Sequence, residues 1–195
     1  IVYTHLYGSM SDTTEIENFC KQNGILFVED AAQSLGSSLD GRKAGTIGDV
    51  SSFSFNSNKV IAGIAGGGIL MTDDKEIANR VSSLRRHGKT DFGFEDPNGI
   101  NSKMYFFNSE VIKYRLSNMG LFQVNRNEIA KQYDKAFKKS PFVIQKNDRT
   151  LQHNYHKYVV RFEDTETREF VQNNLKRHNI GHSVHYDRPL SDNPV

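Results

Sequence analysis

Hydrophobic positions switch between strand-like and helix-like spacing over the first thirty residues. Residues 1–4 are β-branched and aromatic, which is typical of a strand. Apolar residues at helical spacing predict a helix over 12–23, which an Asp-x-x-Glu signal opens and Gly24 ends. The continuous apolar run 25–28 predicts a strand that is buried on both faces. Strand, helix and strand in this order predict a parallel βαβ unit.

Strand-like and helix-like segments continue along the rest of the chain. The predicted elements are strands at 52–55, 68–72, 155–162 and 180–186, helices at 74–88, 127–139 and 166–178, and a loop over 89–103. This order predicts an α/β protein. We expect one large domain over 1–138 and part of a smaller domain over 139–195, with the boundary between 138 and 150.

Charge and cysteine content exclude several function classes. Lys and Arg number 25 and Asp and Glu 23, and these charges are interspersed, which argues against a dedicated nucleic-acid or acidic-lipid binder. No apolar run approaches the roughly 18 residues that a membrane span needs. The single cysteine, Cys20, excludes an intramolecular disulfide and fits a reducing compartment. We therefore expect a cytoplasmic protein without membrane contact.

The two ends of the sequence lack the usual features of complete termini. The chain starts at Ile1 in a strand-like segment, and residues 191–195 stop in a turn-like Ser-Asp-Asn-Pro-Val. We expect an internal segment of a longer chain, with a processed N-terminus as the alternative.

Two polar features follow predicted strands. Asp30 comes after a buried strand, and the carboxyl ends of strands in open α/β sheets face ligands, although a helix cap is the structural alternative. Lys59 follows a polar segment, 54–58, whose side chains can donate hydrogen bonds to phosphate oxygens. Two apolar residues follow Lys59 and favour its partial burial, which lowers an amine's pKa and makes it nucleophilic; a solvated surface lysine is the alternative.

Glycines at 63 and 66–68 follow the lysine. No Gly-Lys-Ser/Thr follows them, so the phosphate-binding loop pattern of nucleotide hydrolases is missing. A dinucleotide fingerprint also fails, because these glycines lead into a strand and not into a helix. The hypothesis of a nucleotide-dependent oxidoreductase is thus supported by these glycines alone. We favour the interpretation that they let the backbone turn tightly beside a bound group.

An acid at a strand end, a short polar loop and a following lysine fit pyridoxal phosphate (PLP). That cofactor needs a lysine amine, a carboxylate facing its pyridine nitrogen, and neutral donors for its phosphate.

Several blocks, in their order and spacing, resemble the DegT-type sugar aminotransferases, which are fold-type I PLP enzymes. These blocks are Glu-Asp-Ala-Ala-Gln-Ser at 29–34, Gly-Thr-Ile-Gly-Asp at 45–49, Ser-Phe-Ser-Phe at 52–55, Lys59 and Gly66–Gly68. The resemblance runs over nearly the whole chain. It implies a three-layer fold with a mostly parallel sheet, followed by the start of a small α+β domain.

The resemblance also implies functional roles. It assigns Lys59 as the Schiff-base lysine, Asp30 as the partner of the pyridine nitrogen, Gln33 as a contact to the ring hydroxyl, Ser54 as a phosphate donor, and His185 and Tyr186 as substrate contacts. It further implies amino transfer from glutamate to a nucleotide-linked keto sugar, a homodimer with shared active sites, and a place in cell-surface polysaccharide or related sugar biosynthesis.

One block departs from the family. The Gly-x-Asn-x-Arg block, whose Asn reaches the partner subunit's phosphate, is degraded, and Asn108 or the segment 114–117 can take its place. We favour Asn108. This departure motivates an alternative from another class, a non-catalytic remnant that binds no cofactor.

Histidine pairs give a weaker signal. His153 with His156, or His182 with His185, could be metal ligands, but their spacing is ordinary and no carboxylate triad accompanies them, so surface or core histidines are favoured. We expect no metal site.

Overall fold

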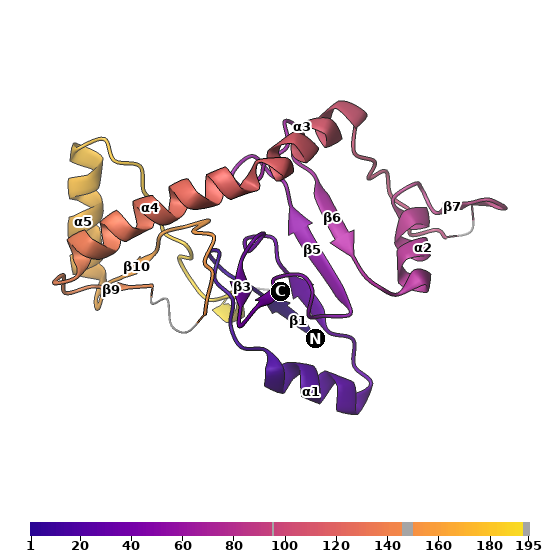
Figure 1. Ribbon diagram of the computed structural model, residues 1–195, viewed down its shortest axis with the longest axis horizontal. Helices are drawn as coiled ribbons and strands as arrows, with labels where there is room; N and C mark the ends of the chain where they lie inside the picture. Colours follow the sequence, from indigo (N-terminus) through magenta and orange to yellow (C-terminus); the bar gives the residue numbers. More distant parts are fainter. Residues whose placement is uncertain (95, 146–149, 193–195) are drawn as a thin grey trace. The chain divides into compact units, whose positions relative to one another are not determined.

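The computed structural model describes residues 1–94, 96–145 and 150–192 (Figure 1). The chain packs as two compact units. Unit 1 comprises Ile1–Lys138 and Gln145–Val159, and unit 2 comprises Lys139–Ile144 and Val160–Val195. The division into a large domain over 1–138 and a small domain over 139–195 stays a prediction.

A four-stranded sheet lies at the centre of unit 1. Its strands are β1 (Val2–Thr4), β2 (Val28–Asp30), β5 (Val50–Ser54) and β6 (Gly68–Met71), in the spatial order β1-β2-β5-β6. Strands β1, β2 and β5 are parallel, and β6 runs antiparallel to β5. The predicted α/β class with a mostly parallel sheet is confirmed.

Helix α1 (Thr14–Asn23) connects β1 to β2, as the hydrophobic pattern predicts. Gly24 ends it in the left-handed conformation, and Cys20 is buried on its inner face. The strand after it was predicted over 25–28 but lies at Val28–Asp30. The backbone N–H of Phe27 donates to the Asp49 carboxylate at 2.8 Å, so this residue bonds outside the ladder and the strand starts later.

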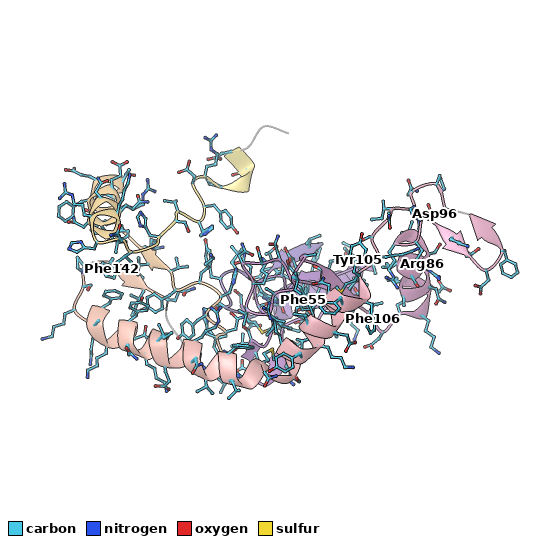
Figure 2. All side chains as sticks on the ribbon, turned by 90° about the horizontal axis from the view of Figure 1, so that it is seen from above. Phe55, Arg86, Asp96, Tyr105, Phe106 and Phe142 are labelled. Atoms are coloured by element: carbon cyan, nitrogen blue, oxygen red, sulfur yellow. The ribbon has the colours of Figure 1, made fainter. Side chains whose placement is uncertain are left out.

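Three helices follow the sheet in unit 1. Helix α2 (Lys75–Leu84) begins as predicted, because the Asp74 carboxylate accepts hydrogen bonds from the N–H groups of its first turn. Helix α3 (Phe106–Ser117) was not predicted, and α4 (Met119–Phe137) starts before the predicted residue 127. At the start of α3, Phe106 is exposed, as is Tyr105 before it (Figure 2). The apolar residues of α3 therefore do not line one buried face, and the hydrophobic periodicity that indicates a helix is absent there.

Short strands complete both units. In unit 1, hairpins form from β3 (Ser38–Leu39) with β4 (Arg42–Lys43) and from β7 (Lys89–Thr90) with β8 (Gly93–Phe94). In unit 2, β9 (Val143–Ile144) pairs antiparallel with β10 (Val160–Arg161), and α5 (Thr165–Arg177) and a 3₁₀ turn (Leu190–Asp192) follow.

Two strands predicted in the last third of the chain are not formed as expected. The strand predicted over 155–162 is reduced to β10, because residues 154–157 bond to the β1–α1 connection instead. The strand predicted over 180–186 is wrong: these residues are exposed and form no ladder, and the Ile180 N–H bonds back to Leu175 in α5. No helix in the described part of the chain is long and apolar enough to cross a membrane.

The apolar core of unit 1 consists of two clusters. One contains Met10, Ala31, Ala44 and Phe53, and the other contains Phe55, Ile61 and Ile112. Figure 2 shows Phe55 within the dense side chains of this unit. Phe55 and Ile61 bracket the segment that carries Lys59, so the core fixes both ends of that segment.

A buried carboxylate joins the sheet to the loop before β5. Glu29, in the middle of β2, is fully buried, and its oxygens accept hydrogen bonds from the backbone N–H groups of Gly45 (2.9 Å), Ile47 (2.7 Å) and Gly48 (2.8 Å). The His5 Nε2 lies 3.0 Å from the same carboxylate. Burial alone would raise the pKa of Glu29, but these hydrogen bonds outweigh it and lower the pKa to about 2.

We expect Glu29→Gln to lower the free energy of unfolding by about 3 kcal/mol, because an amide nitrogen would face N–H donors. Glu15→Gln on the exposed face of α1 is the matched control and should change little. Because the folded-state pKa lies below the usual 4.5, the contribution of Glu29 is complete above that pH and is lost as pH falls toward about 2. Urea unfolding between pH 3 and 7 checks this, and equal acid sensitivity of the wild type and Glu29→Gln would contradict it.

Candidate functional site

The carboxyl ends of the parallel strands bring the first candidate residues together. The ladder aligns Thr4 of β1 with Asp30 of β2, and Asp30 with Ser52 of β5. The Asp30 carboxylate accepts a hydrogen bond from the Ala32 N–H at 3.1 Å and a longer one from the Thr4 hydroxyl at 3.4 Å. Asp30 is therefore held at the carboxyl end of the parallel strands, and its side chain is half-buried.

Gln33 lies in the turn directly after this strand end. Its side-chain oxygen accepts a hydrogen bond from the Tyr7 N–H at 2.8 Å, which ties the turn to the end of β1. The fully buried Asn154, far along the chain, donates from its side-chain amide to the carbonyls of Gln33 (2.9 Å) and Leu35 (3.0 Å). Gly8 makes this possible, since a Cβ there would lie 1.9 Å from the Asn154 oxygen.

Lys59 lies in the loop between β5 and β6. The loop turns at residues 56–59, where the Lys59 N–H donates to the Asn56 carbonyl at 3.0 Å, and Ile61 is then fully buried. Lys59 itself is partly buried, as its apolar neighbours predict. Its amine makes no hydrogen bond or ion pair with any residue that the structure describes.

Burial and two charges set the protonation of this amine. Burial lowers the pKa of Lys59 below its usual range; the Asp30 carboxylate opposes this shift, and the positive charge of Lys157 adds to it. Lys157 reaches the site because its backbone N–H donates to the Tyr7 carbonyl at 3.0 Å. The Lys59 amine, with its lowered pKa, is thus under the influence of one acid, Asp30, and one further lysine, Lys157.

Ser54 ends β5 next to the lysine loop. Its hydroxyl oxygen accepts a hydrogen bond from the Asn56 N–H at 3.3 Å. Its position, two residues beyond the partner of Asp30 in the ladder, keeps it at the same sheet edge. A hydroxyl that accepts one backbone hydrogen bond can still donate its own proton to an anion.

Asn108, near the start of α3, is buried. Its side chain bonds to backbone groups within residues 63–67 of its own chain, which we call the glycine loop. Arg115, in the rival segment 114–117, donates to the Ala62 carbonyl of the same loop region. Both candidates for the degraded family block therefore contact the segment after Lys59. The reach of Asn108 to a partner subunit's phosphate stays a prediction.

His185 and Tyr186 belong to unit 2, where both are exposed and their rings meet edge to face at 5.5 Å. Their role in substrate contact stays a prediction. His153 is buried in unit 1, and burial lowers its pKa to about 4. The described residues contain no group of three or more His, Cys, Asp or Glu side chains that could hold a metal ion.

The residues at this edge fit a cofactor of the PLP type. A partly buried amine with no bonded partner among the described residues is available for attachment, and an acid at the neighbouring strand end can face a ring nitrogen. Ser54 and the loop N–H groups are neutral donors of the kind that a phosphate needs.

Three residues of this site, Glu29, Asn154 and Lys157, are not predicted by the sequence patterns. Glu29 lies within the Glu-Asp-Ala-Ala-Gln-Ser block, and its only sequence signal is a carboxylate directly after an apolar run. Asn154 and Lys157 carry no local signal, since they contact residues well over a hundred positions away.

Comparison with known proteins identifies similar chains. The model of the DegT/DnrJ/EryC1/StrS aminotransferase family matches residues 1–195. The UDP-2-acetamido-2-deoxy-3-oxo-D-glucuronate aminotransferase of Pseudomonas aeruginosa is 30% identical over 199 residues, covering 100% of this chain and 54% of the relative. The dTDP-3-amino-3,6-dideoxy-alpha-D-galactopyranose transaminase of Aneurinibacillus thermoaerophilus is 31% identical over 192 residues, covering 97% and 51%. The chain thus spans about half the length of the curated relatives it matches.

Solved structures give the same result. An aminotransferase from Brucella abortus aligns with a TM-score of 0.90 at 25% identity, covering 99% of this chain and 51% of that one. The DesV protein of S. venezuelae aligns with a TM-score of 0.89 at 28% identity, covering 99% and 52%. These matches confirm the predicted fold class, and the transaminase names of the relatives do not favour a non-catalytic remnant.

The charges around Lys59 predict opposite effects of two substitutions. Lys157→Met removes a neighbouring positive charge and should raise the pKa of Lys59, whereas Asp30→Asn removes a negative charge and should lower it further. Competitive acetylation across a pH series, read by mass spectrometry of the Lys59 peptide, measures both shifts. Lys21→Met, on the exposed face of α1, should leave the Lys59 titration unchanged. Shifts of the same sign in both variants would contradict the assignment.

Proposed function

Because the chain belongs to the DegT/DnrJ/EryC1/StrS aminotransferase family, we propose that it carries the cofactor-binding site of a PLP-dependent aminotransferase that acts on a nucleotide-linked keto sugar. The observation that carries this proposal is the Lys59 amine, partly buried and with no bonded partner among the described residues, in the electrostatic field of Asp30. A solvated surface lysine would have neither burial nor a neighbouring strand-end acid.

When bound, PLP supplies an electron-accepting ring that makes a proton on the amino-bearing carbon removable. Lys59 provides the attachment point, and its lowered pKa leaves more of the amine unprotonated near neutral pH. As a free amine, the Lys59 nitrogen would be the base that takes up and returns that proton.

Other residues at the strand ends orient the ring. Asp30 would offer a carboxylate oxygen to the ring nitrogen and so stabilise its protonated form. Gln33, fixed by Tyr7, lies in the turn where a ring hydroxyl contact would form. The Ser54 hydroxyl would donate a hydrogen bond to the phosphate.

Membership of the family supports further proposals about the amino donor, the oligomeric state, the substrate contacts and the biological setting. We propose glutamate as the amino donor, a homodimer as the working form, His185 and Tyr186 as substrate contacts, and cell-surface polysaccharide or related sugar biosynthesis in the cytoplasm as the setting. The names of the relatives support the substrate class, since both act on sugars carried by a nucleoside diphosphate.

Lys59→Ala should abolish covalent attachment of PLP, because it removes the attaching nitrogen. The purified chain is mixed with PLP, and its absorbance spectrum is recorded before and after borohydride. The wild type should show a red-shifted band that borohydride converts, and Lys21→Ala should behave like the wild type. The same band in Lys59→Ala would refute the assignment.

A further inference from the structure

Asn108 closes the glycine loop with three hydrogen bonds. Its side-chain oxygen accepts from the backbone N–H groups of Ile64 (2.7 Å) and Ala65 (3.3 Å), and its amide nitrogen donates to the Gly66 carbonyl at 2.7 Å. The residue is only 6% exposed. A side chain that uses both its acceptor and its donor on three consecutive residues fixes their backbone direction.

The loop that Asn108 closes is the return path of the segment that carries Lys59. The Gly63 N–H donates to the Phe55 carbonyl at 2.8 Å, and the Phe55 N–H donates to the Gly67 carbonyl at 2.8 Å. Residues 56–62 therefore leave and re-enter the core at one point. The 63–67 backbone is therefore bonded to both sides of the segment on which Lys59 lies.

The fit between the side chain and the loop is close. A Cβ at Gly63 would lie 2.4 Å from the Gly66 carbonyl oxygen and 2.5 Å from the Asn108 side-chain oxygen. Arg115, from the same helix, adds a bond to the Ala62 carbonyl. Helix α3 thus contacts the backbone after Lys59 through two side chains, Asn108 and Arg115.

We propose that Asn108 is a positioning residue for Lys59, holding the 63–67 loop so that the lysine segment stays closed and its amine stays partly buried. The inference deepens the proposed function, since it concerns the same lysine, and it gives Asn108 a task within its own subunit. A hydrophobic residue of similar size could fill the space but could not bond to Ile64, Ala65 and Gly66.

The test follows the Lys59 amine in the full chain without any cofactor. Asn108→Ala should open the loop, let water reach the amine, and shift the midpoint of Lys59 acetylation to higher pH, because burial is the main cause of its lowered pKa. The charges that face the amine, Asp30 and Lys157, are unchanged in this variant. Asn23→Ala is the matched control, since it removes one exposed helix-capping bond to Phe19 and should leave the Lys59 midpoint unchanged.

A second variant tests the same contact in case Asn108→Ala does not fold. Gly63→Ala keeps Asn108 but places a methyl group against the Gly66 carbonyl, so it should displace the loop and shift the Lys59 midpoint in the same direction. An unchanged midpoint in either variant, when circular dichroism shows that variant folded, overturns the proposal. A general loss of stability without a shift at Lys59 counts against it as well.

The acetylation result for Asn108→Ala can be distinguished from the result of the PLP-attachment experiment on Lys59. Acetylation needs no PLP, so the loop contact can fail while PLP attachment to Lys59 holds. Equally, Lys59 can show the shift in Asn108→Ala even if PLP attaches elsewhere.

Discussion

The hydrogen bonds of the buried Glu29 carboxylate are the interaction on which the joining of the three parallel strands depends. It sits in the central strand β2, accepts three backbone N–H bonds from the loop before β5, and meets His5 just after β1. One side chain therefore links the middle of β2 to the residue after β1 and to the loop that enters β5. Since side chains alternate along a strand, the inward direction of Glu29 sends Asp30 the other way, toward the candidate site.

Polar side chains from distant segments then hold the loops at this edge. Asn154 ties the Gln33 turn to Gly8, and Asn108 ties the glycine loop beside Lys59. Both asparagines are buried, and both satisfy backbone groups that would otherwise lack partners. The chemistry of the site thus depends on residues that touch no reacting group but fix the backbone that carries the reacting ones.

The electrostatics of Lys59 follow from this closure. Burial by itself lowers the amine's pKa, and the acid and the second lysine act in opposite senses on top of that shift. An exposed loop with the same three charges would leave the amine protonated and solvated. The reactivity of the lysine is therefore a property of the closed loop as much as of its neighbours.

Local patterns predicted much of this arrangement. The helix over 12–23, the strands near 52 and 68, and the positions of Asp30 and Lys59 after strands all follow from hydrophobic spacing and turn signals. The start of β2 did not, because the Asp49 carboxylate captures the Phe27 N–H. Helix α3 was missed because its aromatic residues lie exposed. The contacts of Asn154 and Lys157 connect segments remote in sequence, so no local pattern could reveal them.

We propose that the strand ends and the closed loop present Lys59, and no other lysine of the chain, to PLP. Peptide mapping of the PLP-treated, borohydride-reduced protein tests it most directly. We expect the pyridoxyl mass on the peptide that contains Lys59, with Lys157 unmodified. A pyridoxyl group on Lys157, or spread over surface lysines with Lys59 free, would contradict it.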